Sequence, residues 1–145
     1  MAAPARACPF CAIVAGEAHA SLVHEDAATL AFLDRAPVFL GHVLLIPRAH
    51  VATIYDADDA TLTAMALASR RLAVAVTQAM QADGCFVAQN NVVSQSVPHL
   101  HAHIIPRRKG DGLFSPRVIW KRVTYESPSQ LAEVAAVIRA ALPEG

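Results

Sequence analysis

The sequence predicts an α+β fold built on a largely antiparallel sheet. Apolar strands are expected in pairs, at residues 28–34 and 41–47 and again at 85–89 and 99–105, with one long helix between the pairs. Strands that come in pairs before and after a helix favour this class of fold. A chain of 145 residues leaves no room for a second core of useful size, so we expect one domain over residues 1–145.

Turn residues mark the ends of the first strands and of the long helix. "ATLAFLD" and "GHVLLIP" are apolar runs joined through the turn at 35–37, and Pro47 closes the second run. The helix is expected over about 58–82, where Asp83-Gly84 stops it. Apolar residues recur within it at roughly helical spacing: Leu62, Met65, Leu72, Val76 and Met80.

A second pair of strands and a final helix complete the predicted fold. "CFVAQ" and "HLHAHII" have the composition of buried strands, and Pro106 is expected to end the latter. The tail "SPSQLAEVAAVIRAALP" begins a helix with Ser127 as N-cap and Pro128 at the first helical position. Gln130 completes a capping box, and Pro143 is expected to end the helix.

Charge and hydropathy exclude two classes of partner. Lys+Arg and Asp+Glu number 12 each, so the formal net charge is zero and no extended nucleic-acid surface is expected. The N-terminus "MAAPARACPFC" lacks the apolar core of a signal peptide. The most apolar helical stretch is interrupted by Arg70 and Arg71, so we expect no membrane partner.

The cysteines indicate a compartment and a kind of site. Their number, three, is odd, and two of them form a Cys8-x-x-Cys11 pair. This usage favours a reducing cytoplasm, with metal binding or redox chemistry rather than a disulfide framework.

Three histidines alternate along the predicted strand at residues 99–105. Residues two apart on a strand point to the same face. One face would therefore carry a row of three imidazoles, His99, His101 and His103. The other face would point into the core with Leu100, Ala102 and Ile104. A neutral imidazole is a competent nucleophile near pH 7, and it can attack phosphorus when its other ring nitrogen is held as a donor. A second imidazole can then contact the phosphate or protonate the leaving group. A metal-binding row or a solvated face would show the same spacing.

Three blocks of the sequence resemble the histidine-triad (HIT) superfamily. "QSVPHLHAHIIPR" resembles its His-φ-His-φ-His-φ-φ signature, in which φ is apolar. "EDAATLAFLDRAPVFLGHVLLIPRAH" is similar to the other half-site of the family, and "CPFCAIVAGE" resembles the start of its bacterial members. The resemblance implies a HIT-like fold: a sheet of about five strands with one long central helix and a C-terminal helix.

The resemblance also implies roles for the catalytic residues. His101, the middle histidine, would be the nucleophile that takes a nucleoside monophosphate from phosphorus, and His103 would contact the phosphate. His42 matches a further active-site histidine of the family. Gln95 and Ser96 match polar positions that face the phosphate and the leaving group, although Ser96 would equally satisfy a loop backbone. No catalytic metal is required for this chemistry.

Five further residues match nucleotide-binding positions. Asp34 matches the acidic residue that binds the ribose hydroxyls, a task that suits a carboxylate because it accepts from two vicinal hydroxyls at once. Phe10, Ile13 and Phe32 match the apolar slot for the base, and Asn91 is favoured over its neighbour Asn90 as the loop asparagine. As alternatives, Asp34 is a turn residue and the three apolar residues belong to the core.

The loop before the histidines departs from the family pattern. Family members often carry a glycine just before the Gln-Ser pair, whereas here the loop reads "NNVVSQSV" with Ser94 in that position. A residue other than glycine does not readily adopt a positive φ. We therefore expect the backbone amide that would cradle phosphate to sit differently.

A metal site is implied by four matching residues. Zinc-containing members of the family use two cysteines, a histidine after the second strand and the first triad histidine, which correspond here to Cys8, Cys11, His50 and His99. A closed Cys2His2 site leaves no open coordination position, so the zinc would be structural. A redox role for the two cysteines is the alternative.

Taken together, the resemblance implies a cytoplasmic, homodimeric nucleotide hydrolase. It would cleave nucleoside 5′-monophosphates linked through phosphorus to an amine or another phosphate, through a covalent nucleotidyl-histidine. Nucleotidyl transfer by the same histidine, and a zinc-stabilised nucleotide-binding or scaffold protein with little turnover, are the alternatives. Residues 110–124 show no regular pattern. Four of them either shape the leaving-group side of the site or serve only ordinary packing and solvation: Arg117, Trp120, Lys121 and Arg122.

Overall fold

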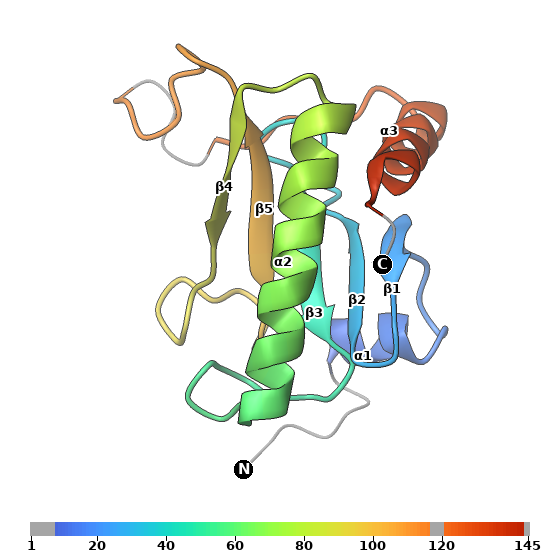
Figure 1. Cartoon of the computed structure of the whole chain (residues 1–145), viewed down its shortest axis with the longest axis vertical. Helices are drawn as coiled ribbons and strands as arrows, with labels where there is room; N and C mark the ends of the chain where they lie inside the picture. Colours follow the sequence, from blue (N-terminus) through green and yellow to red (C-terminus); the bar gives the residue numbers. More distant parts are fainter. Residues whose placement is uncertain (1–7, 117–120, 144–145) are drawn as a thin grey trace.

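The computed structural model describes residues 8–116 and 121–143, and within them it confirms the α+β fold with an antiparallel sheet (Figure 1). The strands lie in the order β1-β2-β3-β5-β4, and every neighbouring pair is antiparallel. In chain order the elements are α1 (Pro9–Val14), β1 (Leu22–Glu25), β2 (Thr29–Leu33), β3 (Val43–Pro47), α2 (Asp59–Ala79), β4 (Gly84–Ala88), β5 (Ala102–Arg107) and α3 (Pro128–Ala141).

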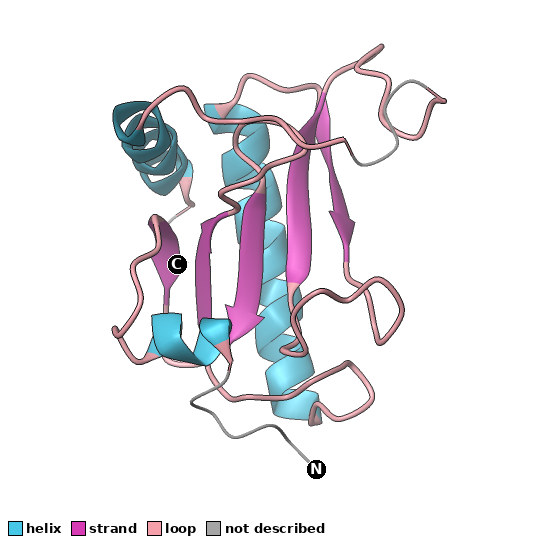
Figure 2. Cartoon of the chain, turned by 180° about the vertical axis from the view of Figure 1, so that it is seen from behind, coloured by secondary structure: helices cyan, strands magenta, loops and turns pink. Residues whose placement is uncertain are grey.

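The two faces of the sheet carry different layers. Helix α2 runs along one face, with α3 beside it near β1 (Figure 1). The main core lies in this layer, where Leu72 and Val76 of α2 meet strand residues such as Leu45 and Ile104. Helix α1 lies against the opposite face (Figure 2), and Phe10 packs there in a second cluster: Cys8, Leu30, Phe32, Leu44 and Ile46. Because side chains alternate along a strand, this second face can carry a site while the first carries the core.

The ends of the predicted elements are confirmed to within a few residues. Strand β3 ends at Pro47 as expected, whereas β5 runs one residue past Pro106, which pairs with Cys85 of the edge strand β4. Helix α2 begins after an Asp58 N-cap and ends at Ala79, three residues earlier than predicted. Its last turn gives way to Gln81, which takes a positive φ of 51° and starts the turn into β4.

The start of α3 follows the predicted capping pattern with one difference. Ser127 caps the helix by accepting a hydrogen bond from the Gln130 amide, and Pro128 opens it. The Gln130 side chain reaches back to the amide of Glu126, one residue before the cap. The helix ends at Ala141, two residues before Pro143, because the residue before a proline is disfavoured in helical conformation.

Two elements were not located by residue range in the sequence. Helix α1 is six residues long and β1 four, so neither shows enough periodicity to stand out. Within the described residues, no helix combines the length and hydropathy needed to cross a membrane.

Candidate active site and metal centre

Three histidines gather on the face of the sheet that α1 covers. His103 on β5 lies directly opposite Leu44 of β3, so both side chains share this face. His42 comes immediately before β3, and its Nε2 lies 2.9 Å from His103 Nδ1. The rings of His101 and His103 have their centroids 5.1 Å apart. The ring of Phe10 in α1 lies edge-on to the rings of both His99 and His101. The expected row of His99, His101 and His103 therefore faces α1, although β5 begins at Ala102 and the first two histidines precede it.

The other side of this segment faces the core as expected. Leu100, Ala102 and Ile104 are buried in the main core cluster against α2. The amide of Leu100 donates to the carbonyl of Val51 at 2.7 Å, which keeps the chain aligned before the strand begins. The alternation predicted from sequence thus extends beyond the strand itself.

The hydrogen bonds of His42 and His103 define their tautomers. The Val38 amide donates to His42 Nδ1 at 3.1 Å, so the proton of the neutral His42 ring is on Nε2. That proton points at His103 Nδ1, 2.9 Å away, which must then act as the acceptor. A neutral His103 therefore carries its own proton on Nε2. The backbone at Val38 thus determines, through two rings, which atom of His103 is a donor.

His101 has the arrangement that a nucleophilic imidazole needs. Its Nδ1 lies 2.8 Å from the carbonyl oxygen of His99, to which it can only donate, since a carbonyl has no proton. The lone pair is then on Nε2. Burial is the main cause that lowers the pKa of His101, and its residual exposure is 3%, so the neutral form is favoured at pH 7.

Burial also keeps the other two rings neutral. Desolvation lowers the pKa of His42 to about 3 and that of His103 to about 4, with smaller contributions from neighbouring imidazoles. The nearby Asp34 carboxylate opposes both shifts, because an opposite charge favours imidazolium. Desolvation prevails, so the hydrogen bond between the rings joins two uncharged groups at neutral pH.

Asp34 follows β2 and lies beside this pair of rings. Its Oδ2 is 3.8 Å from His42 Nε2, and its amide donates to the carbonyl of His42. The same Oδ2 accepts a hydrogen bond from Arg122 Nη1 at 2.7 Å. Of the four residues considered for the leaving-group side, Arg117 and Trp120 lie outside the described residues, whereas Arg122 contacts the carboxylate matched to ribose.

The residues matched to the base and ribose line one cavity. This cavity has a volume of about 320 Å³, and Phe10, Ile13, Phe32 and Asp34 all contribute to its wall. The Phe10 ring meets Phe32 edge-on at a centroid distance of 5.4 Å and His101 at 5.2 Å. The volume is at the low end of the range for small-molecule sites. The apolar residues therefore belong both to a packed cluster and to a cavity wall.

His19 also lines this cavity. Its segment, between α1 and β1, has no pattern that marks a site, so only the fold places it here. A larger cavity of about 800 Å³ lies between the start of β1 and α3 and shares His19, Ala20 and Arg35 with the first. Among the described residues, no triad histidine lines either cavity. The smaller cavity is the candidate site because two of its lining residues contact the histidines: Phe10 lies 5.2 Å from His101 between ring centroids, and Asp34 Oδ2 lies 3.8 Å from His42 Nε2.

The loop before the triad is held by its own amide side chains. Asn91 Oδ1 accepts from the amide of Ile54 at 2.8 Å, and Gln95 Nε2 donates to the carbonyl of Ala52 at 2.6 Å. Both residues thus tie the loop to the segment after β3. Ser96 is exposed three residues before His99.

Ser94 adopts the left-handed conformation despite its side chain. Its φ is 58°, and Val92 nearby has a φ of 72°. The expectation that a residue other than glycine would avoid a positive φ at this position is therefore wrong. Gln95 gives the physical reason, because its Oε1 accepts from the Val92 amide at 3.0 Å while its Nε2 anchors the loop. The strained turn is stabilised by side-chain hydrogen bonds in place of a glycine.

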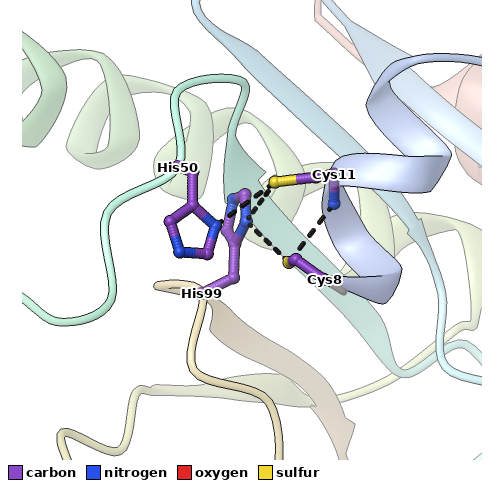
Figure 3. A group of neighbouring side chains, drawn as sticks. All are labelled: Cys8, Cys11, His50 and His99. Carbon is purple, nitrogen blue, oxygen red and sulfur yellow. Dashed lines mark hydrogen bonds between the residues drawn. The ribbon is translucent and has the colours of Figure 1, made fainter. Parts of the chain in front are cut away.

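The four residues matched to zinc form one cluster (Figure 3). Cys8 and Cys11 come from the start of α1, His50 follows β3, and His99 precedes β5 (Figure 3). Their ligand atoms lie within 4.8 Å of one another.

The spacing in this cluster fits a tetrahedral zinc. Cys8 Sγ and Cys11 Sγ lie 3.4 and 3.6 Å from His99 Nδ1, and Cys11 Sγ lies 3.2 Å from His50 Nδ1. Zn–S and Zn–N bonds of about 2.3 and about 2.0 Å at tetrahedral angles place S and N ligands roughly 3.6 Å apart. His99 Nε2 is directed at the carbonyl of Pro47 at 2.9 Å, which leaves Nδ1 for the metal. The residues present therefore fit the ion.

The comparison with known families agrees with this geometry. The model of the HIT domain matches residues 15–110, which is more than half of the chain. This chain belongs to the HIT family.

Relatives of this HIT protein include an enzyme. Adenosine 5′-monophosphoramidase HNT1 of Saccharomyces cerevisiae is 40% identical over 113 residues, which cover 74% of this chain and 69% of the relative. A Hit-like protein from Bartonella henselae has a crystal structure with a TM-score of 0.83 and 37% identity, covering 97% of this chain and all of that one. The fold of this HIT protein is thus that of its crystallised relatives.

A relative of known structure contains zinc, the metal that the Cys8–Cys11–His50–His99 cluster fits. The Zn-bound histidine triad family protein from Mycobacterium smegmatis is 35% identical, with a TM-score of 0.81 over 95% of this chain and 94% of that chain. Zinc is therefore found in a HIT protein that shares the architecture of this one.

Proposed function

We propose that this HIT protein is a nucleotide hydrolase that cleaves nucleoside 5′-monophosphates from an amine or a second phosphate. One observation carries the proposal: His101, neutral and with Nδ1 held by the carbonyl of His99, contacts the ring of Phe10, which lines a cavity together with Asp34. The similarity to an adenosine 5′-monophosphoramidase supports the same class of substrate. Phosphoramidates and dinucleoside polyphosphates are the two substrate types that we put forward.

In the proposed first step, His101 Nε2 attacks the α-phosphorus of the bound nucleotide. A nitrogen–phosphorus bond forms, and the bond between phosphorus and the leaving group breaks. The leaving group departs with the electron pair of that bond and takes up a proton from solvent water. The Nδ1 proton of His101 stays on its hydrogen bond to His99, which stabilises the positive charge that the ring gains.

In the second step, water attacks phosphorus and releases the nucleotide from His101. A phosphorus–oxygen bond forms, the bond between phosphorus and Nε2 breaks, the water gives one proton to the solvent, and Nε2 recovers its lone pair. His103 contributes the Nε2–H that its tautomer provides, and it would donate to a phosphate oxygen in both steps. His42 fixes that tautomer, so it acts through His103. Gln95 and Asn91 order the loop on which Ser96 approaches the phosphate and the leaving group.

The nucleoside would occupy the 320 Å³ cavity. Phe10, Ile13 and Phe32 offer apolar walls to the base, and Asp34 accepts from the ribose hydroxyls. Because Oδ1 and Oδ2 each have more than one acceptor direction, the existing hydrogen bonds to Asp34 leave room for both hydroxyls.

We propose a structural zinc held by Cys8, Cys11, His50 and His99, which would place this protein in the bacterial zinc-containing branch of the family. The support is the fit of the four ligand atoms and the zinc found in the mycobacterial relative. A zinc ion bound there would link α1 to the segments on either side of it without taking part in the reaction. The redox alternative predicts instead a protein without stoichiometric metal.

We further propose that the chain forms one domain, works in the cytoplasm and pairs as a homodimer. Strand β4 lies at one edge of the sheet, where its backbone can pair with another strand. A two-fold dimer through this edge would continue the sheet across the interface. In the single chain the apolar side chain of Val87 on β4 is 45% exposed, and a partner subunit at this edge would cover it.

The test uses the purified protein with an adenosine phosphoramidate and with a diadenosine polyphosphate. We expect hydrolysis of at least one, and we expect His101→Ala to lower kcat/KM by at least about a thousandfold, because the nucleophile is lost. His24→Ala is the matched control, since His24 is an imidazole of β1 bonded to Asp26 outside the cavity.

Two outcomes would favour the alternatives. Binding of AMP with no hydrolysis above that of His101→Ala would indicate a nucleotide-binding or scaffold protein. Release of a nucleotidyl product joined to an added acceptor, in place of free nucleotide, would indicate a transferase.

A further inference from the structure

Arg122 reaches the proposed ribose site from a distant part of the chain. Its Nη1 donates to Asp34 Oδ2 at 2.7 Å and also to the carbonyl of Ala36. The two partners of this ion pair differ in exposure, since the side chain of Asp34 is 14% exposed and that of Arg122 39%. An ion pair on a mostly buried carboxylate is screened less than a pair at the surface.

The backbone around Arg122 is anchored to the loop between β2 and β3. The Val123 amide donates to the carbonyl of Pro37 at 2.8 Å, and the Gly41 amide donates to the Tyr125 hydroxyl at 3.0 Å. Asp34 and His42 stand at the two ends of that loop. The segment that carries Arg122 is therefore tied to the same loop as the residue that it contacts.

Arg122 and the Ala36 amide together fix the carboxylate of Asp34. The Ala36 amide donates to Oδ1 at 2.9 Å while Arg122 holds Oδ2, so the plane of the carboxylate is defined by both oxygens. Accepting from two vicinal hydroxyls requires a fixed plane, because both oxygens must meet their donors together. The guanidinium also balances the charge of Asp34, which would otherwise repel the phosphate of a nucleotide.

The position of Arg122 also disfavours metal binding by Asp34 and the two histidines beside it. Asp34, His42 and His103 offer ligand atoms within 4.8 Å of one another, as a metal site would. A guanidinium 2.7 Å from Asp34 Oδ2 already supplies the positive charge there and disfavours a second cation. The carboxylate is thereby kept for a neutral hydrogen-bond donor such as a hydroxyl.

We propose that Arg122 is a positioning residue that gives this site its preference for ribonucleotides over 2′-deoxyribonucleotides, by holding the Asp34 carboxylate toward both ribose hydroxyls. The inference rests on the proposed function, in which Asp34 binds the ribose. Arg122 itself touches Asp34 and not the nucleotide.

The test compares the Kd values of AMP and 2′-deoxy-AMP by titration calorimetry. The wild-type protein should bind AMP more tightly by about tenfold or more, the effect of one hydrogen bond to a charged group. In Arg122→Gln the Kd of AMP should rise about tenfold while that of 2′-deoxy-AMP changes about twofold at most, so the ratio approaches one. Arg122→Lys should keep part of the preference, because an ammonium retains the positive charge and can donate to Asp34 Oδ2, but its side chain is shorter than that of arginine, whose Nη1 makes both contacts here.

Asp34→Asn and a double variant complete the experiment. Asp34→Asn should lose the preference, and Arg122→Gln should have no further effect on the ratio in that background. Arg107→Gln is the matched control, since it removes another Arg–Asp pair, with Nε 2.8 Å from Asp111, outside the cavity. It should leave the ratio of Kd values unchanged.

Binding and turnover separate the two proposals. A wild-type ratio near one, or a ratio that stays at the wild-type value in Arg122→Gln while Asp34→Asn lowers it, would overturn the role of Arg122. Failure to hydrolyse either substrate would overturn the proposed function and leave the binding test intact. If Arg122→Gln does not fold, Arg122→Met decides in its place, because it keeps the apolar stem and removes the charge. A ratio equal to that of the wild type would then contradict the role of Arg122.

Discussion

At the scale of single residues, the site depends on which nitrogen of each imidazole carries the proton. Three backbone groups decide this: the Val38 amide for His42, the His99 carbonyl for His101, and the Pro47 carbonyl for His99. The alternation of histidines was evident from the sequence, and so was the need for one nitrogen of the nucleophile to be held as a donor. The partners that set the other tautomers were not. Pro47 lies 52 residues from His99, and Val38, four residues from His42, meets it only through the irregular fold of the loop between β2 and β3.

The buried neutral histidines predict that the protein is less stable in acid. The pKa of His42 is lowered to about 3 and that of His103 to about 4, whereas an unfolded histidine titrates near 6.5. Between these values the unfolded chain binds protons that the folded one does not. Stability is therefore full above about pH 6.5 and falls as the pH drops toward 4, by up to about 1.4 kcal/mol per pH unit for each ring.

Urea unfolding at pH 7.0 and 5.5, with a chelator present so that metal release does not contribute, measures this loss. His42→Asn removes one of the buried rings whose pKa is lowered, so the difference in unfolding free energy between the two pH values should become smaller. His24→Asn is the control, because His24 lies outside this pair of rings. An unchanged pH dependence in His42→Asn would contradict the assignment of His42 as neutral and buried.

At the scale of elements, α1 connects the Cys8–Cys11–His50–His99 cluster to the cavity. It is six residues long, too short to be stable in isolation. It nevertheless contributes Phe10 and Ile13 to the cavity wall and Cys8 and Cys11 to the cluster. The resemblance to the family assigned two of these residues to the base slot and two to the metal site without predicting the helix, because it compares positions, and about one and a half turns of helix have little periodicity.

Metal removal should therefore weaken nucleotide binding as well as stability. Without zinc, α1 loses its attachment to His50 and His99, and Phe10 loses its fixed place against His101. We expect chelation, or Cys11→Ser, to lower the thermal midpoint by more than about 5 °C, which corresponds to roughly 2 kcal/mol for a domain of this size. The Kd of AMP should rise in parallel.

Elemental analysis, thermal unfolding and AMP calorimetry on the same sample check this prediction. Cys85→Ser is the matched control, because Cys85 lies on β4 outside the cluster. An AMP affinity that is equal with and without zinc would show that α1 keeps its place by packing alone.

At the scale of the whole molecule, the sheet has the main hydrophobic core on one face and the candidate site on the other. Helices α2 and α3 cover one face of the sheet and α1 the other (Figures 1 and 2). The main core lies under α2 and α3, whereas the histidines, the cavity and the Cys8–Cys11–His50–His99 cluster lie on the side of α1. The hydrophobic pattern of the strands and of α2 was sufficient to predict the fold class, because a period of two or of 3.6 is a local property.

Contacts that join distant segments were beyond such a pattern. Arg122 and Asp34 are 88 residues apart, and residues 110–124 offered no regular spacing from which to infer their meeting. The place of His19 in the cavity wall was equally unpredictable, because only the path of the chain between α1 and β1 brings it there. Single domain organisation and dimerisation remain predictions.

The central claim is that His101 becomes covalently attached to the nucleotide. Rapid mixing of the protein with an adenosine phosphoramidate, followed by a quench that preserves phosphorus–nitrogen bonds and by peptide mass spectrometry, measures it most directly. We predict an adenylyl adduct on the peptide that contains His101, present during turnover and missing in His101→Ala. Hydrolysis at the full rate with no adduct at any time, or an adduct on His103 or His42, would contradict the account.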